Sequence, residues 1–256
     1  MAFYIAILLG LIQGLTEFLP ISSSGHLLII EKIFKIDANL NFINIVLHLA
    51  TLLAVCWFYR KRLLNMVKHP FSKEVQHLII ATIPTIVFVI AFNDFIDTHL
   101  TSSLFLAIGF FVTSILLLAC HFYTQKTKYN ANINYKNSLL MGIAQALAIF
   151  PGLSRSGTTL AFGLIGGIQK EKALDFSFLM SMPIILGSLV YEVIKNNTFY
   201  TTFNTDYILP LICAFIVAFL TAIFSIKIMQ KIVSKLKLWY FVPYLIILGV
   251  CVIIFL

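Results

Sequence analysis

Apolar runs long enough to cross a lipid bilayer recur from one end of the chain to the other. A hydrocarbon core of about 30 Å needs roughly 20 apolar residues in a helix. Runs of this kind cover residues 40–59, 76–96, 103–123, 174–194, 207–226 and 239–256. Since 60% of the 256 residues are hydrophobic and 11% are charged, the composition excludes a soluble globular domain. The sequence predicts a single membrane-embedded, all-α polytopic domain covering residues 1–256.

Two further apolar stretches, residues 1–38 and 138–168, are interrupted near their middle by proline, glycine and serine. Neither half of either stretch is long enough to cross the bilayer comfortably. Non-helical backbone at this depth is tolerated only where protein or a water-filled cavity surrounds it. We therefore expect two re-entrant helix hairpins, each of which enters and leaves the membrane on the same side.

The two hairpins also resemble each other in sequence. Aligning residues 13–25 with residues 145–157 pairs Gln, Leu, Phe, two Ser and Gly in both copies. Each copy is followed by three spans, which predicts an internal repeat of residues 1–128 and 129–256. Because an odd number of spans inverts the second copy, the hairpins are expected to enter from opposite sides and to meet near the midplane.

Basic residues are distributed unevenly among the loops. If both hairpins are re-entrant, one side of the membrane carries Arg60, Lys61, Arg62, Lys68, Lys73, Lys126, Lys128, Lys136, Lys170, Lys172, Lys227, Lys231, Lys235 and Lys237. The other side holds Lys32, Lys35 and Lys195. Cytoplasmic loops normally carry the basic excess, so the pattern predicts both termini outside. The net charge of +8 then reflects topology, and we expect no nucleic-acid partner.

The start of the chain and its cysteines carry little functional signal. The first residues contain no basic segment and no small-residue cleavage site, so we expect no removable signal peptide. The four cysteines are isolated within apolar runs and lack the spacing of a metal site. We interpret them as small core residues.

Polar and ionisable residues gather in the two hairpin tips. Residues 22–26 read SSSGH, and residues 154–158 read SRSGT. Glu17 lies in the first hairpin and Arg155 in the second. An ionisable group at the centre of a membrane helix costs at least about 2.5 kcal/mol unless it is paired, so both residues are functional candidates.

Structural explanations compete with functional ones for these residues. A Glu17–Arg155 ion pair could simply lock the hairpins together, although it would leave His26 and the serines unexplained. The serine hydroxyls could bind carbonyls freed near the two prolines of the tips. His26 alone resembles a hydrogen-bonded core histidine, and we interpret His48, inside the first span, in that way.

Taken together, the two tips fit phosphoryl transfer. A helix is expected to begin after each Ser-x-Ser-Gly, and its free N–H groups make an anion cradle, so two opposed cradles suit a substrate with two phosphates. A serine hydroxyl can attack phosphorus, a histidine or glutamate can carry a proton, and an arginine can bind phosphate oxygens bidentately. A divalent cation, Mg²⁺ or Ca²⁺, held by Glu17 and phosphate oxygens would assist this chemistry.

At these residues the sequence resembles the bacterial undecaprenyl-diphosphate phosphatase family, also known for bacitracin resistance. Its two signatures are matched by residues 13–26 and 151–159, and the likeness covers the whole chain, including residues 175–183. The resemblance implies six transmembrane helices plus two re-entrant helix hairpins in an inverted repeat. It also implies removal of the terminal phosphate of undecaprenyl diphosphate, which recycles the lipid carrier of cell-wall synthesis. The enzyme would lie in the bacterial cytoplasmic membrane, with its active site facing the periplasm.

The resemblance also implies a role for each matching residue. Ser23 is the candidate nucleophile, Glu17 and His26 are the proton-handling or metal-linked pair, and Arg155 is the diphosphate clamp. The other implied substrate contacts are Gln13, Ser22, Ser24, Gly25, Ser154, Ser156, Gly157 and Thr159. Gln13 stands where many members carry Glu, and its neutral amide would bind a divalent cation beside Glu17 less tightly than a carboxylate. A polyprenyl diphosphate and membrane lipids are the implied partners, and a homodimer is compatible with them.

Two functions from other classes compete with this interpretation. A transporter or flippase for a polyprenyl-phosphate lipid would also use inverted repeats with broken helices. In that protein Glu17 and Arg155 would bind an ion or a headgroup. A structural scaffold is the third reading, and it predicts that substitutions at these residues change stability alone.

Overall fold

A computed structural model describes residues 3–36, 40–99, 102–125, 129–195 and 208–256. Within these ranges the protein consists of eleven α-helices and one 3₁₀ helix. Extended backbone pairs there in a single bridge, between Ala131 and Ile168. The all-α class predicted from the sequence is therefore confirmed.

Among the described helices, five are long and apolar enough to cross a membrane. They are α5 (Lys73–His99), α6 (Ser103–Thr124), α9 (Lys170–Lys195), α10 (Ile208–Ser234) and α11 (Phe241–Phe255) together with the preceding η3 (Leu238–Tyr240). A sixth span is obtained when α3 (Leu40–Phe58) is counted with α4 (Arg60–Lys68), although the chain bends by 77° between them. Each of the six predicted spans corresponds to one of these helices, and the bend separates apolar α3 from a helix that begins with three basic residues.

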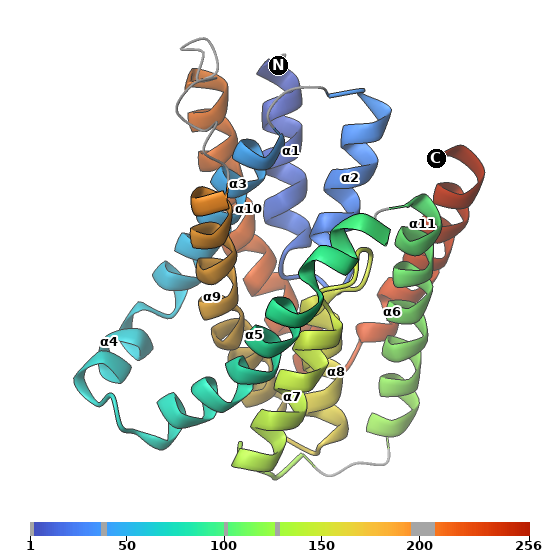
Figure 1. The fold of residues 1–256 in the computed structure, drawn as a ribbon. Coiled ribbons are helices and arrows are strands. Elements are labelled where there is room, and N and C mark those ends of the chain that lie inside the picture. The colour runs from blue at the N-terminus through green and yellow to red at the C-terminus, as the bar shows by residue number, and fades with distance from the viewer. Residues whose placement is uncertain (1–2, 37–39, 100–101, 126–128, 196–207) are drawn as a thin grey trace.

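The two interrupted apolar stretches form helix–turn–helix hairpins. The first consists of α1 (Phe3–Thr16) and α2 (Ser23–Ile33), and the second consists of α7 (Tyr135–Leu147) and α8 (Arg155–Ile165). At about 1.5 Å per residue, each arm is roughly 16–21 Å long, which is too short for a hydrocarbon core of about 30 Å. In Figure 1 the first turn points down from the end that holds the termini, the second points up from the opposite end, and the two turns meet in the middle.

Packing between the two halves of the chain is reciprocal. Arm α1 packs most extensively on α10, the second span of the second half, and arm α7 packs on α5, the second span of the first half. The first spans, α3 and α9, contact each other, and so do the third spans, α6 and α11. Each half thus completes the other, which is the arrangement expected of halves related by a pseudo-two-fold axis.

Equivalent glycines let the hairpin arms approach their partner helices closely. A Cβ atom on Gly10 would lie 2.4 Å from the carbonyl oxygen of Ala214 on α10. A Cβ atom on Gly142 would lie at the same distance from the carbonyl oxygen of Ala81 on α5. Small residues at helix contacts are typical of membrane proteins, where close backbone approach replaces the hydrophobic effect as a source of packing energy.

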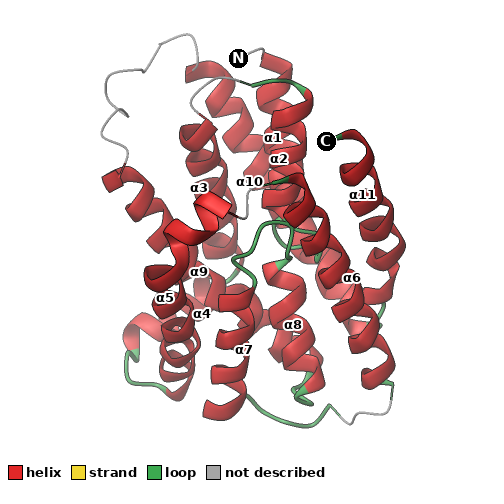
Figure 2. Ribbon diagram, turned by 45° about the vertical axis from the view of Figure 1, so that its right-hand side comes forward, coloured by secondary structure: helices red, strands yellow, loops and turns green. Residues whose placement is uncertain are grey.

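The termini and the basic segments lie at opposite ends of the molecule. Figure 2 shows both termini at one end, whereas the loop that follows α4 and residues 129–134, which lead into α7, lie at the other. Lys170 donates a hydrogen bond to the carbonyl of Ser234 at 3.2 Å, which brings the end of α10 to the start of α9 at this basic end. Of the basic residues assigned to this end, Lys126 and Lys128 lie outside the described residues.

Candidate active site

The turns of the two hairpins have the same local structure. Ser22 caps α2 by accepting a hydrogen bond from the amide of Gly25 at 3.3 Å. Ser154 caps α8 by accepting one from the amide of Gly157 at 3.2 Å. Each capping hydroxyl also lies near the hydroxyl of the serine two residues later, at 3.4 Å in the first turn and 3.3 Å in the second. The repeated Ser-x-Ser-Gly is therefore a repeated helix cap.

Each cap leaves the first amides of its helix available to a ligand. Within the described residues, the backbone N–H groups of Ser23, Ser24, Arg155 and Ser156 donate to no protein acceptor. Such groups carry the positive end of the helix dipole and bind anions. Two helix starts in opposed hairpins thus offer donors for the two phosphates of a diphosphate.

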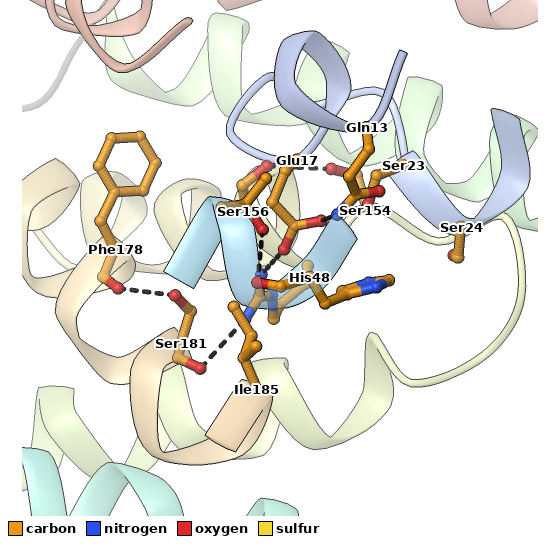
Figure 3. Close-up of polar contacts among 12 residues, drawn as sticks. Gln13, Glu17, Ser23, Ser24, His48, Ser154, Ser156, Phe178, Ser181 and Ile185 are labelled. Atoms are coloured by element: carbon orange, nitrogen blue, oxygen red, sulfur yellow. Dashed lines mark hydrogen bonds and ion pairs between the residues drawn. The ribbon is translucent and has the colours of Figure 1, made fainter. Parts of the chain in front are cut away.

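Glu17 and Arg155 join the two hairpin tips. Arg155 Nη2 forms an ion pair with Glu17 Oε1, and Arg155 Nη1 donates to the carbonyl of Ser181 on α9 at 3.3 Å (Figure 3). The second oxygen of Glu17 accepts hydrogen bonds from Ser23 Oγ and, at 3.1 Å, from Gln13 Nε2. The expected nucleophile, carboxylate and guanidinium therefore form one connected network.

Burial makes this ion pair sensitive to the loss of either partner. The side chain of Glu17 is 4% exposed and that of Arg155 is 19% exposed. Removing one member of a buried pair leaves an uncompensated charge, at a cost of about 3–5 kcal/mol. The pair does lock the hairpins together, but this role alone does not account for the Ser23 contact or for the cavity beside it.

A cavity of approximately 270 Å³ lies between the hairpin tips and α9. Its polar lining consists of Glu17, Ser22, Ser23, Ser24, His48, Ser154, Arg155 and Ser188. Its apolar lining consists of Ala148, Ile149, Leu153, Ile184 and Ile185. A cavity with polar and apolar lining suits an amphiphile whose charged head continues into a hydrocarbon chain.

Several residues expected to touch the substrate have side chains that hold the hairpins together. Ser156 Oγ donates to the carbonyl of Leu19 at 2.8 Å, and the hydroxyl of Thr159 shares a hydrogen bond with that of Ser177 on α9 at 2.6 Å. Neither Ser156 nor Thr159 lines the cavity. Gln13 is fully buried behind Glu17 and is not part of the lining either.

The two glycines of the caps are explained by packing between helices. A Cβ atom on Gly25 would lie 2.6 Å from the ring of Phe110 on α6, and one on Gly157 would lie 2.9 Å from Pro20 Cβ. Neither glycine lines the cavity. Their small size is therefore needed for α2 and the second hairpin to reach their neighbours, while their amides donate to the capping serines.

His26 also lies outside the cavity lining. Its Nδ1 donates to the carbonyl of Ser22 at 2.8 Å, and its Nε2 accepts from the hydroxyl of Tyr244 on α11 at 2.6 Å. The imidazole is stacked on the Tyr244 ring with a centroid distance of 5.7 Å, and Phe110 meets it edge-on. Because both ring nitrogens have protein partners, His26 ties the first turn to α11.

Two polar residues of the cavity were missed by the sequence analysis. His48, interpreted as a core histidine, contributes its side chain to the lining, and so does Ser188 on α9. An ionisable residue in an apolar span was a usable signal for His48. Nothing in the sequence distinguished Ser188, because serines commonly bond the carbonyls of their own helix in membrane proteins. The Ser188 hydroxyl does so as well, since it donates to the Ile185 carbonyl.

Oxygen ligands for a divalent cation are present but few. Gln13 Oε1 is buried and has no hydrogen-bond partner among the described residues, while Gln13 Nε2 holds it beside Glu17. In the part of the chain that the structure describes, no three His, Cys, Asp or Glu side chains gather. Mg²⁺ commonly takes one or two carboxylates and completes its shell with water and substrate phosphates. Glu17 and Gln13 fit a cation of that kind when a phosphorylated substrate supplies further oxygens.

Comparison with known proteins decides the family. Residues 6–251 match the family described as "Bacitracin resistance protein BacA". The chain belongs to this family. Undecaprenyl-diphosphatase of Carboxydothermus hydrogenoformans is 35% identical over 252 residues, which cover 97% of this chain and 95% of the relative. The protein of the same name from Acinetobacter baumannii is 35% identical over 259 residues, covering 97% and 94%.

A third relative matches a shorter stretch at higher identity. Undecaprenyl-diphosphatase 4 of Bacillus thuringiensis subsp. konkukian is 40% identical over 187 residues, which cover 73% of this chain and 72% of the relative. The resemblance deduced from the two hairpin motifs is confirmed by these matches to the BacA family.

Proposed function

We propose that this integral membrane protein is an undecaprenyl-diphosphate phosphatase, which hydrolyses undecaprenyl diphosphate to undecaprenyl phosphate and inorganic phosphate. Membership of the BacA family and the names of its relatives support this activity. The observation that carries it is the network of Glu17, Arg155 and Ser23 on the wall of a cavity with polar and apolar lining. Such an enzyme recycles the cell-wall lipid carrier and confers resistance to bacitracin.

Substrate binding would use groups that the two tips leave available. The free amides at the starts of α2 and α8 would hold phosphate oxygens, and the Arg155 guanidinium would bind them bidentately. Phosphate oxygens then compete with Glu17 for Arg155, which frees the carboxylate to accept a proton. Isoleucines 149, 184 and 185 would contact the first isoprene units of the lipid.

Ser23 would act as the nucleophile. Its hydroxyl donates a hydrogen bond to Glu17, so the proton can pass to the carboxylate as Ser23 Oγ attacks the terminal phosphorus. The bond from this phosphorus to the bridging oxygen breaks, and undecaprenyl phosphate leaves with the electron pair. Arg155 stabilises the charge that develops on the phosphoryl oxygens. Water then hydrolyses the phosphoserine and releases inorganic phosphate.

A divalent cation is part of this proposal. Glu17 and Gln13 would hold Mg²⁺ or Ca²⁺ together with oxygens of the substrate, and the cation would neutralise part of the diphosphate charge. This chain's own contribution is a buried Gln13 amide whose nitrogen donates to Glu17 and whose oxygen has no hydrogen-bond partner among the described residues.

We further propose a location and an assembly. The excess of basic residues at the end opposite the termini supports a multi-pass protein of the bacterial cytoplasmic (inner) membrane, with its termini and its active site facing the periplasm. A homodimer is compatible with this arrangement.

Phosphate release from undecaprenyl diphosphate by the purified protein in nanodiscs tests the function. The wild-type protein is expected to turn over, whereas S23A, E17Q and R155A should lose at least about 10²-fold in rate. S234A is the matched control, because Ser234 lies at the exposed basic end. Absence of release in the wild type would favour a lipid transporter. Equal release in all variants would contradict the assigned chemistry.

A further inference from the structure

His48 is the unexplained ionisable group of the cavity. Its imidazole extends from α3 into the same lining as Glu17, Ser22, Ser23 and Ser24, and it is half-buried there. In Figure 3 the ring points toward the side of the site on which Ser24 lies.

The hydrogen bond of His48 determines which of its ring nitrogens carries the proton. Nδ1 lies 2.7 Å from the backbone carbonyl of Asn44, and a carbonyl can only accept, so Nδ1 carries the proton. In the neutral ring Nε2 then bears the lone pair. Within the described part of the chain Nε2 takes no hydrogen bond, so it is available to a ligand or a water in the cavity.

His26 and His48 therefore differ in the state of Nε2. The Nε2 of His26 is occupied by the Tyr244 hydroxyl at 2.6 Å, and the ring lies outside the lining. The Nε2 of His48 takes no hydrogen bond from the described residues, and His48 is one of the residues that line the cavity. A base that must take a proton from a substrate or water needs the second arrangement.

We infer that His48 is a further catalytic residue, the general base that activates water for hydrolysis of the Ser23 phosphoester. This assignment rests on the proposed phosphatase function. The water oxygen bonds to phosphorus while its proton passes to His48 Nε2. The bond from phosphorus to Ser23 Oγ breaks, and its electron pair stays on Oγ, which takes back the proton held by Glu17. His48 then returns its proton to solvent or to the departing phosphate.

This division of labour makes a distinct kinetic prediction. Formation of the phosphoserine needs Ser23, Glu17 and Arg155, whereas its breakdown needs His48. In H48Q, which keeps the size of the side chain but cannot accept a proton, we expect one undecaprenyl phosphate to be released rapidly per enzyme. Steady-state phosphate release should then be about 10²-fold slower than in the wild type.

The test uses undecaprenyl diphosphate labelled in its terminal phosphate, with acid quenching at short times. H48Q should retain label on Ser23, and the double variant H48Q/S23A should retain none. H69Q is the matched control, because His69 makes the same Nδ1 contact to the carbonyl four residues earlier but is exposed on the basic end. It should behave as the wild type.

A second variant, H48A, tests the same inference if H48Q does not fold. H48A leaves space in the cavity. Added imidazole should therefore raise the turnover of H48A at least about tenfold, as expected when it replaces a missing proton acceptor. Wild-type turnover in H48Q, slow turnover without retained label, no rescue of H48A, or retained label in H26Q but not in H48Q would each overturn the inference. A wild-type protein that releases no phosphate would instead refute the proposed function.

Discussion

Ser156 and Leu19 connect the two hairpins directly, since the Ser156 hydroxyl donates a hydrogen bond to the Leu19 carbonyl at 2.8 Å. The contact is formed where Gly157 packs against Pro20, the residue that follows Leu19. Two turns that start from opposite ends of the molecule are thereby held against each other. Glu17 lies two residues before Leu19, and Arg155 lies one residue before Ser156, so this bond helps to fix the distance between the charged groups.

Loss of the Ser156 hydroxyl should therefore weaken the protein. In S156A the Leu19 carbonyl loses this buried donor, which is expected to lower the free energy of unfolding by about 1 kcal/mol. Thermal unfolding in detergent measures the effect. S234A removes a hydroxyl from the exposed basic end and should leave the unfolding temperature unchanged. If S156A and S234A unfold at the same temperature, the contact does not stabilise the fold.

Arg155 should not tolerate replacement by lysine. R155K keeps the charge but loses the planar fork that contacts Glu17 and the Ser181 carbonyl together, so phosphate release should fall by at least about 10²-fold. R60K is the control, because Arg60 is exposed on α4, where it donates to the Trp57 carbonyl and lies over the Trp57 ring, far from the cavity lining. Near-normal turnover of R155K would contradict the bidentate clamp.

Ser22 offers a test of the strained first turn. Its φ of 65° lies in the left-handed region, which disfavours residues with a Cβ, and its hydroxyl caps α2. S22G loses the cap but relieves the backbone, whereas S22A loses the cap and keeps the strain. S22G should therefore be more stable than S22A by about 1 kcal/mol in thermal unfolding. The reverse order would show that the backbone is not strained at this position.

Much of the architecture could be predicted because it follows from the free energy of moving apolar and polar groups from water into the membrane. Apolar runs fix the spans, and the breaks at Pro20 and Pro151 fix the hairpins, since each arm alone is too short to cross. The pairing of Glu17 with Arg155 was predictable for the same reason, because neither charge is stable alone in the membrane.

Side-chain direction within the tips could not be predicted. Gly25 is small because Phe110 lies against it, and that residue is distant in the sequence. Likewise, the roles of His26 and His48 depend on whether Tyr244 or a cavity faces the ring. Such information comes from the packing of α6, α11 and α9, which local sequence pattern does not encode.

The orientation in the membrane can be tested by cysteine labelling in intact cells. In a variant whose four native cysteines are replaced, a cysteine at position 102, at the start of α6 near the termini, should react with a membrane-impermeant maleimide. A cysteine at position 65 on basic α4 should react only after permeabilisation. The opposite accessibility would reverse the proposed topology.

Substitution of Gln13 can test the proposed cation site. Its Oε1 has no hydrogen-bond partner among the described residues and would be a neutral ligand in the proposed site, and Q13E would introduce a second negative charge beside Glu17. Divalent cations bind more tightly as the number of carboxylate ligands rises, so half-maximal phosphate release by Q13E should require less Mg²⁺ or Ca²⁺ than the wild type. A chelator should stop both proteins, and S138A, a buried substitution at the start of α7, should keep the wild-type requirement. If Q13E and the wild type respond to the same cation concentration, Gln13 does not ligate the cation. If chelation leaves turnover of both unchanged, Arg155 and the amides at the starts of α2 and α8 neutralise the diphosphate without a cation.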